Sequence, residues 1–295
     1  MLTATKLKES PRDRIFLNIL YAISFLILLV EVYPLLYVVG ASFSSSDAIT
    51  LGKVYLWPVE FSLKGYEMLV GNKDILLGFR NSGFYLVIGT TVNMLLTTLL
   101  AYPLSRKEMP GRNLIMLIVA LTMYIQGGLI PTYLLVDSLD MVDTVWGLVL
   151  PNAIVTTNMI IMRTYFQNTI PDSLREAAFL DGCGDTRFLA NIVLPLSMPI
   201  LAVIGLYYAV GHWNSYFDAL IYLRSSDKQS LQLVLRNILL ANQLSAGDGS
   251  YAESSKLGVT IKYSVIVFSC IPMMIAYPFV QRFFIKGVMI GAIKG

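Results

Sequence analysis

Long apolar stretches separated by shorter polar segments dominate this chain of 295 residues. A helix needs roughly 20 consecutive apolar residues to cross ~30 Å of hydrocarbon. Six stretches approach that length, and they cover residues 15–39, 82–105, 113–130, 145–166, 201–223 and 259–284. The pattern predicts an all-α fold, a polytopic membrane protein with a bundle of six transmembrane helices. One membrane domain, residues 15–295, follows a tail of residues 1–14.

Two of these stretches have informative ends. Basic residues precede the first stretch, as they precede a secretory signal, but its apolar run of roughly 25 residues exceeds the 7–15 of a signal-peptide core. It is therefore predicted to be a retained span. The third stretch is the shortest and ends in Gly127-Gly128 followed by Pro131, residues that terminate helices.

The distribution of Lys and Arg between the spans predicts their direction. The segment at 105–112 is basic, whereas the segment at 131–144 carries three aspartates and no basic residue. This contrast favours an N-in, C-in orientation. The segment 167–199 is then a cytoplasmic loop, and the segments 44–81 and 224–258 are extracytoplasmic loops.

Composition agrees with the membrane pattern and excludes other classes. Charged residues make up 14% of the chain, about half of the ~25% typical of soluble domains, and the mean hydropathy is +0.65. The net charge of +3 and the absence of a basic run with aromatics exclude a nucleic-acid partner. His212 is the only histidine, so neither a metal site nor a catalytic pair is predicted, and the chain is not expected to be an enzyme.

The cytoplasmic loop predicts two short helices. Ile170-Pro171 imposes an extended backbone, and Ser173 with Glu176 fits a capping box at the start of the first helix. Gly182 stands where a left-handed cap would end that helix. The second helix begins near Asp185 and must stop at the proline that follows Leu194.

Leu174, Ala177 and Ala178 recur at helical spacing on the first of these helices. Small residues on this face would let another surface approach the backbone closely. The alternative is an amphipathic helix that lies on the lipid headgroups.

The order of residues in this loop matches a known motif. Glu176-Ala177-Ala178, then Gly182, then Ile192-Val193-Leu194-Pro195 resembles the EAA loop of the permease subunits of ABC importers. In that family the loop is a coupling helix that docks in a groove of the ATPase subunit. The resemblance implies the type I ABC importer permease fold. It also implies ATPase coupling by Glu176, Ala177, Ala178, Gly182, Ile192, Leu194 and Pro195.

The chain contains no GxxxxGK[ST] phosphate-binding loop. No cofactor is therefore expected on this chain, and ATP and Mg would be bound by partner ATPase subunits. The chain itself would be a non-catalytic subunit of an ATP-driven transporter.

Further stretches resemble the carbohydrate-uptake class, in its maltose-transporter type second permeases and its polysaccharide-type, LplC-like branch. They cover residues 127–133, 209–217, 231–236 and 287–295. The resemblance implies import of a carbohydrate, an oligosaccharide in this branch, across the bacterial cytoplasmic membrane. The implied partners are a second homologous permease, two ABC ATPase subunits and an extracytoplasmic solute-binding protein.

Polar and aromatic residues within the spans are candidates for the substrate path, because such residues usually face a bundle interior or a pathway. They are Trp213, Asn214, Tyr216, Tyr124 and Gln126. For Asn214 and His212, the alternative is interhelical hydrogen bonding that holds the bundle together.

The extracytoplasmic loop 224–258 has a flexible tip that includes Gly247, Asp248 and Gly249. Resemblance to maltose-type permeases assigns these residues to contact with the binding protein; an ordinary solvated loop is the alternative.

Two other functions compete with sugar import. An ABC importer of a non-sugar solute would use the same cytoplasmic loop. An ion-coupled secondary transporter should show intramembrane charges and internal repeats, but Glu31 is the only candidate charge and no duplication is visible.

Overall fold

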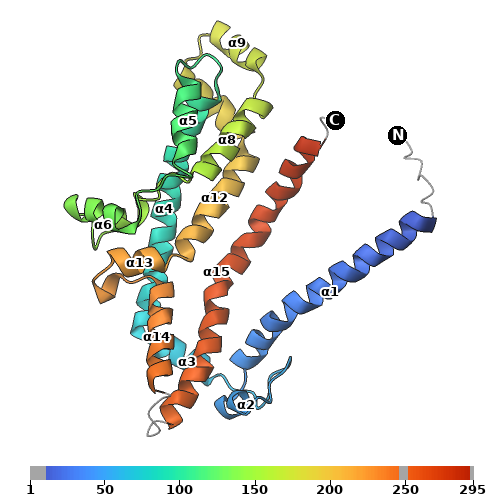
Figure 1. The fold of residues 1–295 in the computed structure, drawn as a ribbon, viewed down its shortest axis with the longest axis vertical. Coiled ribbons are helices and arrows are strands. Elements are labelled where there is room, and N and C mark those ends of the chain that lie inside the picture. The colour runs from blue at the N-terminus through green and yellow to red at the C-terminus, as the bar shows by residue number, and fades with distance from the viewer. Residues whose placement is uncertain (1–10, 246–251, 293–295) are drawn as a thin grey trace. The chain divides into compact units, whose positions relative to one another are not determined.

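The computed structural model describes residues 11–245 and 252–292, and every regular element within those ranges is a helix (Figure 1). The all-α prediction is therefore confirmed for the described residues. The chain forms two compact units. Unit 1 comprises residues 1–71 and 239–269, and unit 2 comprises residues 72–238 and 270–295.

Unit 1 is built around the end of one long helix. Its helices are α1 (Pro11–Ser42), α2 (Ser46–Thr50), α3 (Lys64–Gly71) and the first part of α15 (Ala252–Ala292). A small core forms where Ala41, Ala48 and Val54 meet Tyr263. Ser264 donates a hydrogen bond to the Ser42 carbonyl, which joins α15 to the end of α1.

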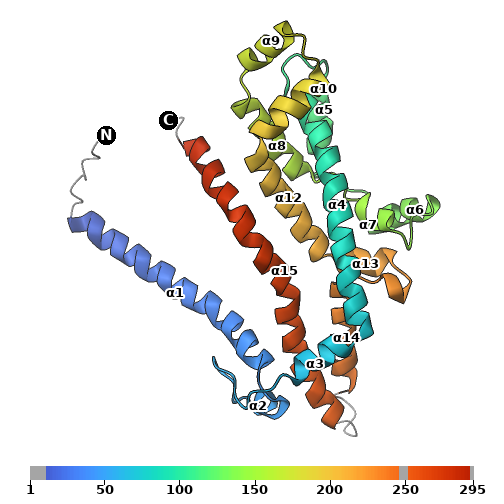
Figure 2. The same cartoon turned by 180° about the vertical axis from the view of Figure 1, so that it is seen from behind.

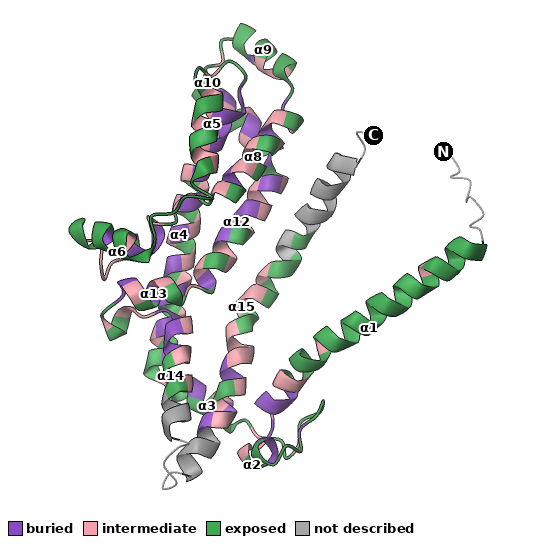
Figure 3. Ribbon diagram, viewed as in Figure 1, coloured by how far each residue is buried: buried purple, intermediate pink, exposed green. Residues whose placement is uncertain are grey.

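Most of α1 exposes apolar side chains, as Figure 3 shows by its colour. A helix that is apolar on all faces belongs in a membrane or in a large core. Within the described residues, three helical segments are long and apolar enough to cross a membrane: α1, α4 (Lys73–Ser105) and Gly258–Pro278 of α15. A bent pair, Asp185–Leu196 with Met198–Trp213, makes a fourth if it is counted as one span.

Unit 2 is organised along α4, which packs most extensively against α12 (Met198–Trp213) and α8 (Thr156–Thr169). Its core joins Ala101 and Leu104 of α4, Met159 and Phe166 of α8, and Ile204 of α12. The shorter helices of this unit are α5 (Arg112–Leu121), α6 (Leu129–Ser138), α7 (Val145–Val149), α9 (Asp172–Leu180), α10 (Asp185–Phe188), η1 (Leu189–Val193), α11 (Leu194–Leu196), α13 (Phe217–Tyr222) and η2 (Ser226–Lys228), while α14 (Leu231–Ser245) begins in it.

Three of the six predicted spans are not single helices. Within 113–130, α5 ends at Leu121 and the backbone stays non-helical until α6. The stretch 145–166 is divided between α7 and α8, and 201–223 between α12 and α13. The predicted continuous helices are therefore wrong at these places, where Gly127-Gly128, Pro151 and Asn214 interrupt the helical pattern.

One end of unit 2 is held together by Asp143, whose side chain joins the loop after α6 to the loop after α13. Its carboxylate accepts hydrogen bonds from Lys228 Nζ at 2.8 Å, from Ser225 Oγ at 2.6 Å, and from the backbone N–H groups of Arg224 and Ser225 at 3.0 Å each. These bonds, first those from the Lys228 and Ser225 side chains, hold the pKa of Asp143 well below its usual range.

Removal of this carboxylate should loosen the end of the unit. A depressed folded-state pKa means that ionised Asp143 stabilises the fold fully above pH ~4 and that this contribution is lost progressively below it. We expect Asp143→Asn to cost about 1–3 kcal/mol at pH 7. The difference in thermal midpoint between wild type and variant, measured in detergent, should narrow below pH ~4.

Asp140→Asn is the matched control, since Asp140 is an exposed aspartate of the same loop. Equal losses of stability in the two variants would contradict the role assigned to Asp143. A difference in thermal midpoint between wild type and Asp143→Asn that does not change with pH would contradict it as well.

Candidate functional site

The segment from residue 170 to 197, here called the α9–α11 segment, lies at the end of unit 2 opposite the start of α14 (Figure 1). The residues that lead into it are extended, as predicted: Ile170 has ψ 103° and Pro171 has ψ 143°. However, α9 begins at Asp172 with Pro171 as its N-cap, and no side chain caps it. The predicted capping box is wrong because Ser173 already lies inside the helix, where its hydroxyl is not at the capping position.

The predicted left-handed cap at Gly182 is confirmed. Gly182 has φ +78°, its N–H donates to the Phe179 carbonyl at 3.0 Å, and the Cys183 N–H donates to the Ala178 carbonyl at 2.9 Å. These two bonds form a Schellman motif, which satisfies the last carbonyls of α9 and turns the chain sharply. The turn leads directly into α10.

The second arm runs from Asp185 to Leu196 and passes through one turn of π-helix at Leu189–Val193. Pro195 lies inside this arm. The arm therefore ends at Ser197, two residues after the predicted stop at Leu194-Pro195. There the arm meets α12 at 84°. A nearly perpendicular pair of helices is therefore built into the chain.

The side chains of the α9–α11 segment are divided between the core and the surface. Ala178, Phe188 and Val193 are buried in the core of unit 2. Glu176, Ala177 and Gly182 are exposed, and so are the neighbouring Phe179 and Leu180, of which Leu180 is 90% exposed. The two alanines of the motif thus do not share one outward face, contrary to the prediction. Of the other residues predicted for coupling, Ile192 and Leu194 are half-buried and Pro195 is exposed.

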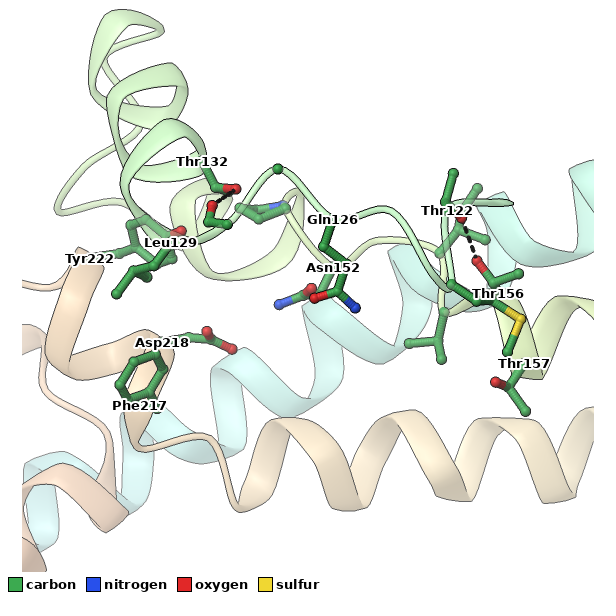
Figure 4. A pocket seen from close by; sticks show the side chains of 16 residues that line it. Thr122, Gln126, Leu129, Thr132, Asn152, Thr156, Thr157, Phe217, Asp218 and Tyr222 are labelled. Carbon is green, nitrogen blue, oxygen red and sulfur yellow. Dashed lines mark hydrogen bonds between the residues drawn. The ribbon is translucent and has the colours of Figure 1, made fainter. Parts of the chain in front are cut away.

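A cavity of about 690 Å³ lies in the middle of unit 2, at the breaks in the three interrupted helices (Figure 4). Its walls come from the backbone around Gly127-Gly128, from the linker between α7 and α8, and from α13. Polar groups include Gln126, Asn152 and Asp218. The other lining residues are Thr122, Met123, Gly127, Gly128, Leu129, Thr132, Pro151, Ile154, Val155, Thr156, Thr157, Phe217 and Tyr222.

Polar side chains of the long helices satisfy the irregular backbone beside this cavity. Asn93 of α4 donates to the Asn152 carbonyl at 3.4 Å. The Val155 N–H donates to the Tyr208 hydroxyl at 3.0 Å, and that hydroxyl is hydrogen-bonded to Thr97 at 2.6 Å. The non-helical linker is therefore fixed in place.

The structure separates the residues predicted for the substrate path. Gln126 lines the cavity, whereas Tyr124 is 84% exposed and is not among the lining residues. Trp213 is buried against Phe79, with ring centroids 5.4 Å apart. Asn214 and Tyr216 are exposed, and Tyr216 lies 5.5 Å from the Arg236 guanidinium.

His212 lies between two helices. Its imidazole packs against Gly89 of α4, where even a Cβ would overlap the ring. Gly247, Asp248 and Gly249 lie outside the described residues. Over the part of the chain that the structure covers, no group of three His, Cys, Asp or Glu side chains could hold a metal ion.

Sequence reasoning missed Asn152 and Asp218. Asp218 falls inside the predicted span 201–223, and an ionisable residue within a span is itself a signal for a functional site. Asn152 follows a proline in the middle of another predicted span. Both signals were available, but only the fold shows that the two residues line one cavity.

No protein-family model matches the chain. The chain is 41% identical to the polygalacturonan/rhamnogalacturonan transport system permease protein YtcP of Bacillus subtilis, over 96% of this chain and all of that protein. It is 38% identical to Protein LplC of the same organism, over 90% of each chain. A crystal structure of a bacterial ABC transporter involved in import of the acidic polysaccharide alginate contains a chain that matches with TM-score 0.85 and 33% identity, over 95% of this chain and all of that one.

These similarities define a permease subunit of a membrane transport system. The chain belongs to the family of ABC transporter permease proteins, as the EAA motif predicted. Such permeases are the membrane components of their transporters, and separate subunits hydrolyse ATP. An ion-coupled secondary transporter is therefore not supported.

Proposed function

We propose that this chain is one of two permease subunits in a bacterial importer that carries an oligosaccharide across the cytoplasmic membrane. The observation that carries this proposal is the similarity, over nearly the whole chain, to a permease named for polygalacturonan/rhamnogalacturonan transport. An arabinooligosaccharide permease, AraQ of Bacillus subtilis, is also a relative, at 25% identity over 98% of this chain.

The proposed topology keeps six membrane segments and an N-in, C-in orientation, with three of the segments broken. Internal contacts support it. Lys107, from the loop assigned to the cytoplasm, pairs with Asp172 of the cytoplasmic α9. Asp143 and Lys228, both assigned to extracytoplasmic loops, pair with each other.

We assign the α9–α11 segment to ATPase coupling. Its exposed tip presents the small Ala177 and the large apolar Leu180 beside Glu176, while Phe188 and Val193 anchor it in the core. A partner subunit that binds and displaces this tip would therefore also displace α12 and α8, which share that core. Two ABC ATPase subunits that bind ATP and Mg, a second permease and an extracytoplasmic solute-binding protein complete the proposed transporter. A crystal structure of the bacterial alginate ABC transporter includes a periplasmic protein bound to an alginate pentasaccharide.

The cavity is the part of the sugar path that we assign to this chain. Sugar hydroxyls require hydrogen-bond donors and acceptors, which Gln126, Asn152 and Asp218 provide, while Phe217 and Tyr222 offer aromatic surface. Trp213 is assigned to packing, since it is buried against Phe79.

The proposal as a whole is tested by assembly and uptake. The chain should copurify with an ABC ATPase and a second permease when the three are expressed together. Vesicles that contain this complex should take up pectin-derived oligosaccharides only when ATP and the binding protein are present. Uptake without ATP, or no association with an ATPase, would refute it. Uptake of a non-sugar solute alone would retain the ABC permease but reject the carbohydrate.

Coupling through the tip of the α9–α11 segment should require a residue at position 182 that adopts the left-handed backbone conformation. A β-branched residue is strained at φ +78°, whereas Asn tolerates this conformation. We expect Gly182→Val to reduce the sugar transported per ATP hydrolysed by roughly threefold or more, since left-handed strain of 1–2 kcal/mol distorts the turn. Gly182→Asn should retain most of the coupling. Equal behaviour of the two variants in proteoliposomes would rule out a conformational requirement.

Substitution in the cavity should slow uptake and leave assembly intact. Gln126→Ala and Asn152→Ala each remove polar groups that line the cavity, and we expect transport to fall by about fivefold to tenfold, the size of one lost hydrogen bond. The matched control is Tyr124→Ala, which alters an exposed residue that is not part of the lining. Wild-type uptake by both cavity variants, at equal expression, would remove the cavity from the path.

A further inference from the structure

Three consecutive residues after α4 contact three different parts of the α9–α11 segment. Arg106 lies over the ring of Phe188 in α10, with its guanidinium carbon 5.9 Å from the ring centre. Lys107 Nζ lies 2.9 Å from Asp172 Oδ2 at the start of α9. Glu108 Oε2 lies 3.0 Å from Arg175 Nη1 in the middle of α9. Figure 2 shows α9 and α10 beside α5 and the end of α4.

Arg175 extends these contacts to the second arm. Its other terminal nitrogen lies 3.5 Å from Asp185 at the start of α10, and its guanidinium covers the ring of Phe179 at 4.7 Å. The Arg175 side chain is 22% exposed, while its partners Glu108 and Asp185 are 60% and 62% exposed, so the pairs lie at the edge of the buried region. One guanidinium thus joins the loop after α4 to both arms of the α9–α11 segment.

Arg106 is the buried member of this group. It is 7% exposed and lies between Tyr102, 4.9 Å from the ring centre, and Phe188. An arginine between two aromatic rings resists rotation of either ring, and Lys lacks the planar group that stacks in this way. The chain directly after α4 is therefore attached to α10 by packing of Arg106 and to α9 by ion pairs.

We propose that residues 106–108, at the end of α4, form a second mechanical connection between the coupling segment and the transmembrane helices. The inference rests on the proposed function and deepens it. In this arrangement a displacement of α9 reaches α4 and α5 directly through Arg106, Lys107 and Glu108, in addition to its route through α12. Arg106, Glu108 and Arg175 are positioning residues, since they act through the segment that meets the ATPase.

The connection is tested by breaking the central ion pair and replacing it with a covalent link. Glu108→Cys and Arg175→Cys are combined in a chain that also carries Cys183→Ser and Cys270→Ser, and the full transporter is reconstituted. A bis-methanethiosulfonate linker then joins the two cysteines, and a reductant releases them. The parent is the chain that carries only Cys183→Ser and Cys270→Ser. We expect the released form to transport roughly threefold less sugar per ATP than this parent, as loss of an ion-pair network allows. The linked form should recover the parent ratio.

Equal coupling in the released and linked forms would overturn the proposal. A linked form that hydrolyses ATP but cannot transport would overturn it as well, because the loop after α4 and α9 would then have to move apart during transport. Unchanged thermal midpoints in both forms separate loss of coupling from loss of folding. Gly182→Val is measured in parallel. If it uncouples while the linker has no effect, only this inference fails; if no ATPase associates with the chain, the proposed function fails first.

Discussion

A backbone within hydrocarbon must satisfy its own hydrogen bonds, and irregular backbone is tolerated there only where it is buried in protein or lines a cavity. Unit 2 follows this constraint. The breaks between α5 and α6 and between α7 and α8 line one cavity, and α13, which follows the break after α12, lines it as well. Tyr208 of α12 and Asn93 of α4 supply partners for the interrupted backbone. The interrupted helices also supply polar groups that line the cavity.

Local features of the α9–α11 segment were predictable because a few adjacent residues decide them. Gly182 ends α9 in the left-handed conformation, and Pro171 makes the preceding chain extended. The capping box failed because Pro171 itself occupies the N-cap, which places Ser173 inside the helix. The two adjacent alanines of the motif also differ in burial, since one faces the core and the other faces the solvent. Helical spacing cannot show which of two adjacent small residues faces a core whose other members, such as Phe166 and Ile204, come from distant helices.

The cavity and the charge network could not be read from the sequence for the same reason: their members are far apart along the chain. Gln126, Asn152 and Asp218 belong to three separate parts of the chain, and only the fold brings them to one cavity. Trp213 is a further case, since its position in a predicted span does not reveal that its ring packs against Phe79 of a distant helix. Glu108 and Arg175 are each unremarkable in sequence, and only the fold places them 3.0 Å apart.

The right angle between the second arm and α12 has a mechanical consequence. The two helices meet at 84° at Ser197, and the arm is anchored in the core by Phe188, directly before its π-helical turn, and by Val193, the last residue of that turn. A pull along the axis of the arm therefore displaces the foot of α12 sideways and has almost no component along its length.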